Sequence, residues 1–158
     1  MSPRVNEKAA TWLTADQLSA WLAFRKMTRT LDARLARDLA RDGGLSMQDY
    51  DVLSALTVTP HHRWCAKHLS AHLLWTASRM SHHIDRMEKR GLVRREPCAK
   101  GRGTDVVLTP DGLDAIRAAA PEHVEAVRRS FVDPLTPEEL AVLARISDAV
   151  LATLEEQP

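Results

Sequence analysis

The sequence predicts a mainly α-helical protein with one small β-hairpin. Apolar residues recur every three or four positions over most of the 158-residue chain, which is the period of an amphipathic helix. Only LVRREP (92–97) and TDVVLT (104–109) read as short strands, and they flank the basic, glycine-bearing turn CAKGRG. With 44% hydrophobic residues, the chain can bury one sizeable core, so we expect a single intertwined domain.

Residues 1–44 are expected to form an N-terminal arm and a long dimerisation helix. Thr14 and Gln17 have the spacing of a capping box, and Gly44 follows the last turn. The end of the arm is expected to dock through Trp12. Because a small domain cannot cover the whole apolar stripe of this helix, we expect part of the stripe to meet another chain. The stripe consists of Trp21, Phe24, Leu31, Leu35 and Leu39.

Residues 45–109 are expected to form the central part of the fold. Ser46 begins a helix, and His61–Trp64 are expected to add a short strand to the sheet of the hairpin. Cys65–Leu73 form the next helix, and Leu74–Trp75 the turn that follows it. We interpret Trp64 and Trp75, which bracket this helix, as core or hinge residues rather than ligand-stacking ones.

The stretch TASRMSHHIDRMEKRG (76–91) predicts a helix with one packed and one exposed face. Thr76 can cap its start and Gly91 suits its end, while Met80, Ile84 and Met87 form a narrow apolar stripe. Short hydroxyls beside Arg and His are what a helix needs to approach base edges in a major groove. A solvated surface helix is the alternative. The exposed face comprises Ser78, Arg79, Ser81, His82, Arg86 and Lys89.

Charge is distributed unevenly along the chain. The formal net charge is only +1, but residues 61–104 hold ten Lys or Arg against three acids, and the remainder is net −6. A basic block in an otherwise acidic chain is typical of a nucleic-acid-binding surface. A base-reading helix followed directly by a basic hairpin is the winged helix-turn-helix plan, in which the hairpin is the wing.

Residues 110–158 are expected to form C-terminal dimerisation helices. Thr109-Pro110 begins a helix that Pro121 should kink, and Thr136 with Glu139 forms a second capping box. The small sheet cannot cover these helices, so their simplest use is a homodimer interface. A two-fold axis would place paired recognition helices roughly 34 Å apart and predicts a pseudo-palindromic operator.

Four runs of sequence resemble the MarR family of transcription regulators. They are LSMQDYDVLSAL (45–56), KHLSAHLLW (67–75), SRMSHHIDRMEKRGLVRRE (78–96) and GRGTDVVLTPDG (101–112). The run RMEKRGLVRRE with VVLTPDG at the expected distance is specific, and with the flanking helices the resemblance covers nearly the whole chain. It implies a homodimeric, DNA-binding regulator, and we expect a repressor.

The expected DNA contacts divide into base-reading and phosphate-binding residues. Arg79 is the first base-reading candidate, Lys100 and Arg95 are expected to bind phosphates, and Arg86 fits either role. Family wings usually carry Asp-x-Arg at the tip. Here Lys100-Gly101-Arg102 keeps the Arg, which the resemblance assigns to the minor groove, but lacks the Asp that would orient it. The full set is Thr76, Ser78, Arg79, Ser81, His82, Arg86, Arg95, Lys100 and Arg102.

The resemblance also implies a small, often anionic aromatic effector between the helical and winged regions. Trp21, Arg25 and Tyr50 are candidates for lining such a cleft, because an apolar wall with one cation and one hydroxyl suits a phenolic carboxylate. Plain core positions for Trp21 and Tyr50 and a surface charge for Arg25 are the alternative.

Two other functions stay open: a thiol-based redox sensor on the same scaffold, and a helical interaction module without DNA binding. The first would need an exposed, low-pKa thiolate at Cys65 or Cys98, yet peroxide sensors of this family usually carry the reactive Cys in the N-terminal helix, which here has none. We expect no disulfide framework and no metal site. His68 and His72 have metal-ligand spacing, but phosphate-facing surface explains them better.

No catalytic constellation, signal peptide or membrane-spanning run is recognisable in the sequence. We therefore expect no enzyme activity, no cofactor, no membrane contact and a cytoplasmic location.

Overall fold

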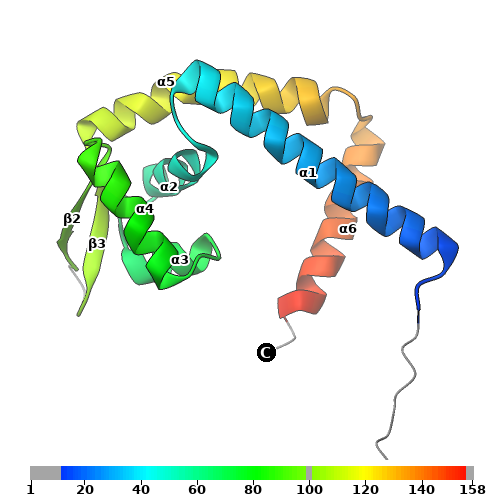
Figure 1. Ribbon diagram of the computed structural model, residues 1–158, viewed down its shortest axis with the longest axis horizontal. Coiled ribbons are helices and arrows are strands. Elements are labelled where there is room, and N and C mark those ends of the chain that lie inside the picture. Colours follow the sequence, from blue (N-terminus) through cyan, green and yellow to red (C-terminus); the bar gives the residue numbers. More distant parts are fainter. Residues whose placement is uncertain (1–11, 99–100, 156–158) are drawn as a thin grey trace, which may run out of the picture.

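The computed structural model describes residues 12–98 and 101–155 as a helical protein with a three-stranded sheet (Figure 1). The helices are α1 (Ala15–Gly43), α2 (Met47–Thr57), α3 (Ala66–His72), α4 (Ala77–Lys89), α5 (Pro110–Val127) and α6 (Pro137–Glu155). The strands are β1 (Arg63–Cys65), β2 (Val93–Pro97) and β3 (Thr104–Leu108). A short 3-10 turn (Pro60–His62) and a π turn (Arg128–Val132) complete the described elements.

Capping residues begin the helices where the sequence predicts. The hydroxyl of Thr14 accepts from the amide of Gln17, whose side chain accepts from the amide of Thr14 in return. Ser46 and Asp49 form the same reciprocal pair at α2. Each box satisfies amides that have no partner within the helix. Gly44 then ends α1 in the left-handed conformation, at φ 63°.

The strand expected at His61–Trp64 lies two residues further along. His61 and His62 adopt φ angles of 57° and 53°, which no β-strand accommodates, and they form a turn instead. The strand is Arg63–Cys65, and it pairs antiparallel with β3 as expected of a third strand.

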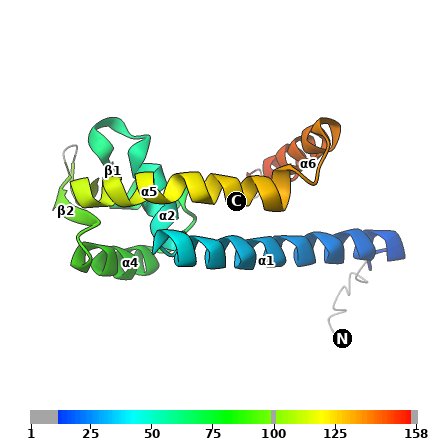
Figure 2. The ribbon, with the colours of Figure 1, turned by 90° about the horizontal axis from the view of Figure 1, so that it is seen from above.

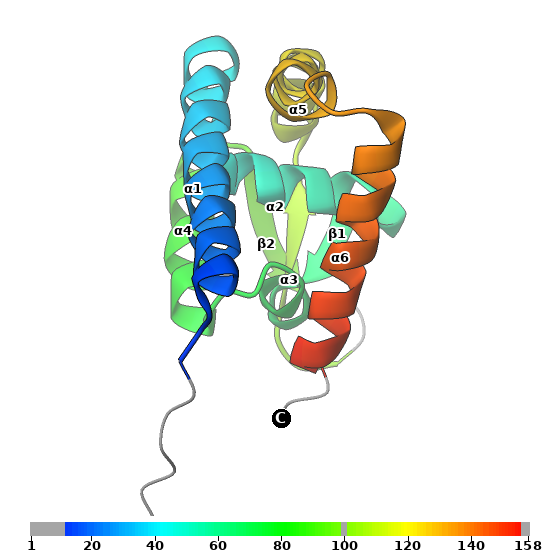
Figure 3. The same cartoon turned by 90° about the vertical axis from the view of Figure 1, so that its right-hand side faces the viewer.

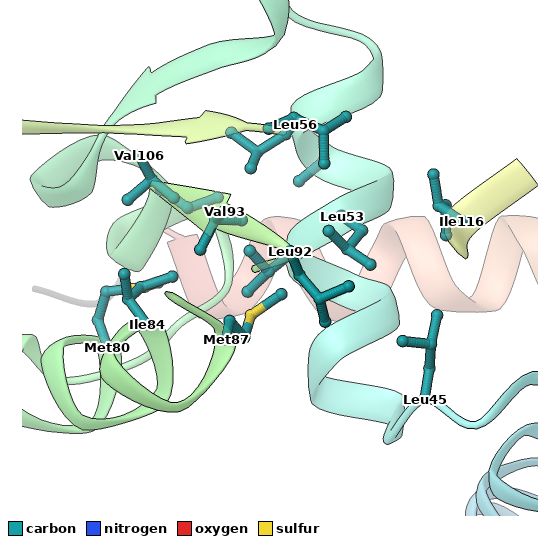
Figure 4. Close-up of a cluster of buried hydrophobic side chains, with 14 of the residues drawn as sticks. Leu45, Leu53, Leu56, Met80, Ile84, Met87, Leu92, Val93, Val106 and Ile116 are labelled. Carbon is teal, nitrogen blue, oxygen red and sulfur yellow. The ribbon is translucent and has the colours of Figure 1, made fainter. Parts of the chain in front are cut away.

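The sheet has the order β1-β3-β2, with every pair antiparallel. One side of it packs on α2, α3 and α4, and the core lies between them (Figure 4). Met80, Ile84 and Met87 are all buried there, which confirms the packed stripe of α4. The central members of this core are Leu53, Leu56, Leu69, Ile84, Met87 and Val106.

Helices α1 and α5 run antiparallel and side by side (Figure 2). In the view of Figure 1 they lie above the winged region, which comprises α2, α3, α4 and the sheet. Gly43 lies so close to Ala119 that a Cβ at Gly43 would stand 2.9 Å from the Ala119 methyl group, so the two helices pack closely there. Helix α5 remains α-helical through Pro121, which was expected to kink it. The change of helical geometry comes later, in the π turn at Arg128–Val132.

Helix α6 lies apart from the core and runs across the direction of α5 (Figures 1 and 3). No residue of α6 is buried, although apolar side chains recur along it. Trp12 is 87% exposed, so the expected docking of the arm does not occur within one chain. No helix in the described ranges combines the length and apolarity that crossing a membrane requires. The exposed large apolar residues of α6 are Val142, Ile146, Val150, Leu151 and Leu154.

Candidate nucleic-acid interface

Helix α4 presents one polar face to solvent, as the sequence predicts. Thr76 caps the helix by accepting from the amide of Arg79 at 3.2 Å, and nothing shields the first two turns. A helix whose N-terminal half is exposed in this way can approach DNA with its side chains foremost. The exposed candidates of this helix are Thr76, Ser78, Arg79, Ser81, His82 and Arg86.

Arg79 is oriented by a tryptophan from the preceding turn. Its guanidinium carbon lies 4.4 Å from the centroid of the Trp75 ring, which is cation–π geometry. Trp75 in turn packs partly buried against the core and meets the ring of His83 edge-on at 5.3 Å. Trp75 is thus a packing residue, as expected, and also a platform that limits the conformations of Arg79.

A buried carboxylate, which sequence reasoning did not single out, fixes α4 against α2. Asp49 is only 3% exposed, and its Oδ2 accepts from Arg90 at the end of α4 at 2.7 Å. Its Oδ1 lies 3.0 Å from Nε2 of His83. Burial alone would raise the pKa of Asp49, but the hydrogen bonds from Ser46 and Arg90 hold it below its usual range. The charged Asp49 carboxylate of α2 therefore holds α4 at two points, His83 and Arg90.

His83 is neutral in this network. Burial lowers its pKa, and the nearby Arg86 lowers it further, which together outweigh the attraction of Asp49. The guanidinium of Arg86 donates to Nδ1 of His83 at 2.8 Å, so Nδ1 carries no proton and Nε2–H faces Asp49. Arg86, a DNA-binding candidate, therefore has an intramolecular partner while remaining exposed.

The wing places Arg102 at an exposed position, whereas Arg95 is engaged within the protein. Arg95 pairs with Asp85 at 2.7 Å and Glu88 at 2.8 Å, and donates to the carbonyl of Ser81. These contacts connect β2 to α4, so the structure gives Arg95 a positioning role besides the phosphate contact predicted for it. Lys100 lies outside the described residues.

Carboxylates neutralise part of the basic block. Arg63 pairs with Asp105, and Arg94 with Glu96. Within the described ranges, the block's cations that form no such ion pair are Lys67, Arg79, Arg86, Lys89 and Arg102. All five lie on α3, on α4 or at the wing tip, at positions that are exposed.

A cavity of 430 Å³ opens between α3, α4 and the wing. Three predicted DNA contacts, Ser81, Arg95 and Arg102, line it together with Lys67. Helix α4 and the wing therefore face a common hollow with a basic rim. His72, beside this region, remains exposed and contacts Trp64, with the ring centroids 5.0 Å apart and the rings tilted by 40°.

The three predicted effector contacts do not meet within one chain. Arg25 lies over the Trp21 ring at 5.5 Å, on the exposed part of α1. Tyr50 belongs to α2 and packs on His123 of α5 at 4.3 Å. Because Trp21 precedes the end of α1 at Gly43 by six helical turns, roughly 33 Å separate it from the α2 end of the helix. Within one chain, the prediction of a single cleft lined by all three residues is therefore wrong.

A three-stranded sheet with α3 and α4 before its hairpin defines the winged helix-turn-helix class (Figure 1). The model of the MarR family matches residues 43–102. AbsC, a MarR family transcriptional regulator from Streptomyces coelicolor, is 38% identical with a TM-score of 0.88, over 94% of this chain and all of that one. The chain therefore belongs to the MarR family of transcriptional regulators.

Two further structures extend the comparison to DNA complexes. Sco3205, a MarR family regulator from Streptomyces coelicolor solved in complex with DNA, is 37% identical with a TM-score of 0.88, covering 94% of this chain and 93% of that one. The S. aureus MepR–DNA complex shares the fold at 15% identity, with a TM-score of 0.74 over 90% of this chain and 99% of that one. No curated protein sequence matches this chain.

Proposed function

We propose that the protein is a sequence-specific DNA-binding repressor that binds a pseudo-palindromic operator as a homodimer. The observation that carries the proposal is the exposed N-terminal half of α4, where Arg79 is held on Trp75 among short polar side chains. A pre-oriented guanidinium can donate two hydrogen bonds to one guanine. The complex of Sco3205 with DNA supports the same use of this fold.

The homodimer is supported by apolar surface that one chain leaves uncovered. Leu18, Trp21, Leu22 and Phe24 of α1 are about half exposed, and they lie on the part of α1 that extends beyond the winged region. Helix α6 exposes a second apolar series. A monomer rarely exposes so much apolar surface, and a second copy of the chain would cover it.

The base-reading role predicts the result of one substitution. Arg79→Ala should weaken operator binding by about 1 to 3 kcal/mol and relax base preference at one position in each half-site. Selection of bound sequences from a random DNA library, with wild type and variant in parallel, measures both effects. Lys89→Ala is the matched control, because it removes an equal charge from the last turn of the same helix. An unchanged sequence preference in the Arg79 variant would refute the role.

Phosphate contacts should behave differently from base contacts. Replacing Lys100 or Arg95 should weaken all DNA about equally and reduce the salt slope by about one unit for each lost contact. If the protein shifts no DNA at low salt, DNA binding itself is refuted, and an interaction module becomes the function to test.

We further propose release of the DNA by a small effector. A cavity of 360 Å³ between α1 and the segment after α5 has a size suited to a small molecule. Met27, Leu31 and Phe131 give it apolar walls. Arg34 also lines it; its Nε donates to Asp38 at 2.9 Å, and the rest of its guanidinium can meet an anionic group. Effector candidates are titrated against the protein–DNA complex, and Phe131→Trp, which narrows the cavity, should abolish release without weakening DNA binding.

A further inference from the structure

Two cysteines and a buried aspartate meet at the base of the wing. Cys65 ends β1 directly opposite Asp105 of β3, so both side chains leave the same face of the sheet. Cys98 follows β2, and its amide donates to the carbonyl of Gly103 across the hairpin. The two sulfurs and one carboxylate oxygen all lie within 4.8 Å of one another. Two distant parts of the sequence, the end of β1 and the β2–β3 hairpin, therefore bring metal-ligand atoms to one point.

A fourth ligand is available in the same cavity. His68 lines the 660 Å³ hollow that also contains Cys65, Cys98 and Asp105. Cys65 is the residue before α3 and His68 lies in the first turn, which is the spacing that brings side chains together in a capping box. The imidazole is exposed, so a change of rotamer can turn it towards the cysteines.

We propose that Cys65, Cys98, Asp105 and His68 form a tetrahedral Zn²⁺ site. Zinc in proteins takes four sulfur, nitrogen or oxygen ligands, and two cysteines with a histidine are a common part of the set. With Zn–S bonds of about 2.3 Å, two tetrahedral thiolates stand about 3.8 Å apart. Because no pair of the three atoms is more than 4.8 Å apart, the cluster needs to contract by about 1 Å at most.

The surroundings suit the charge of such a site. Two thiolates and a carboxylate around Zn²⁺ leave one net negative charge, and the two thiol protons pass to solvent on binding. Arg63 donates to Oδ2 of Asp105 at 2.8 Å and offsets that charge. A zinc carboxylate that uses one oxygen for the metal commonly gives the other to such a donor, which orients it. Arg102 lines the same hollow.

The site would connect the start of α3, through Cys65, to the wing, through Cys98, which directly follows β2. None of its four ligands is among the proposed DNA contacts, although Arg102, which is one of those contacts, lines the same hollow. The site also differs from a pairing of His68 with His72, since His72 contacts Trp64 instead.

Cobalt provides the direct test, because thiolate coordination to Co²⁺ gives a near-ultraviolet charge-transfer band and tetrahedral geometry gives intense visible bands. The full-length protein is titrated with Co²⁺ under a non-thiol reductant without oxygen, and then with Zn²⁺. We expect one Co²⁺ per chain, both sets of bands, their loss as Zn²⁺ displaces Co²⁺, and a melting temperature that rises with Zn²⁺ concentration. Absence of the charge-transfer band would overturn the proposal.

Variants assign the ligands. Cys98→Ser and Cys65→Ser should each lose most of the charge-transfer intensity, and His68→Ala should weaken Zn²⁺ binding at least about tenfold. Asp105→Asn would also disturb Arg63, so its melting curve without metal is measured alongside. His72→Ala is the matched control and should bind metal like wild type. Unchanged spectra in both cysteine variants, or equal losses in the His72 control, would overturn the site.

Discussion

Asp49→Ala should destabilise the protein by about 3 to 5 kcal/mol, although Asp49 touches neither solvent nor any predicted DNA contact. The substitution removes the carboxylate that accepts from the Ser46 amide and from Arg90, and that faces His83. A lost helix cap costs about 1 kcal/mol. Breaking a buried ion pair by removing one partner costs about 3 to 5 kcal/mol, and the partial exposure of Arg90 favours the lower end.

Urea unfolding, followed by far-ultraviolet circular dichroism, measures this loss as a fall in the midpoint at constant slope. Asp85→Ala is the matched control: it removes an exposed carboxylate from a surface ion pair and should cost about 1 kcal/mol or less. A loss below about 1 kcal/mol for Asp49→Ala, equal to the control, would refute the argument that this carboxylate holds α4 in place.

Three other predictions follow from the same contacts. Because burial lowers the pKa of His83, the unfolded chain binds more protons than the folded one below the usual pKa of 6.5. The contribution of His83 to stability is therefore complete above pH 6.5 and is lost as the pH falls below it. In melting curves, His83→Gln should reduce this pH dependence, and His82→Gln should not. Arg95→Ala should cost about 1 kcal/mol of stability, measurable in a double-mutant cycle with Glu88, and a zero coupling energy would contradict its positioning role. Leu151→Glu should dissociate the proposed dimer in sedimentation measurements, whereas Asp148→Ala should leave it intact.

Local signals explain why so much of the fold could be predicted from the sequence. Thr14, Ser46, Thr76 and Thr136 cap their helices through atoms three residues away, so the information lies within one turn. The apolar stripe of α4 needs only the helical period. The hairpin likewise joins neighbouring segments, and its strands pair in the expected order.

Contacts between distant segments could not be predicted in this way. Arg90 lies 41 residues from Asp49, and Arg63 lies 42 residues from Asp105. A charged residue in a helix looks like surface until the packing of a second helix buries it. For the same reason Cys65 and Cys98 looked like isolated thiols, although the sheet brings them together.

The three effector candidates lie apart within one chain for a different reason. Periodicity assigns a residue to a face of a helix, but it does not say which part of a long helix another element covers. Helix α1 has 29 residues and α2 follows its C-terminal end, so Tyr50 of α2 lies far from Trp21, which belongs to the N-terminal part of α1. The strand predicted at His61–Trp64 begins only at Arg63, because His61 and His62 adopt left-handed φ angles. Nothing in the residue types of His61 and His62 indicates that conformation.

The most direct test of the central claim is hydroxyl-radical footprinting of the full-length protein on the operator recovered by sequence selection. Paired α4 helices related by a two-fold axis predict two protected regions on one face of the DNA, centred about 10 base pairs or a small multiple of that apart, with each wing protecting the flanking minor groove. The two halves should be symmetric. One continuous asymmetric footprint, or protection that ignores the selected sequence, would contradict a dimer that reads DNA through α4.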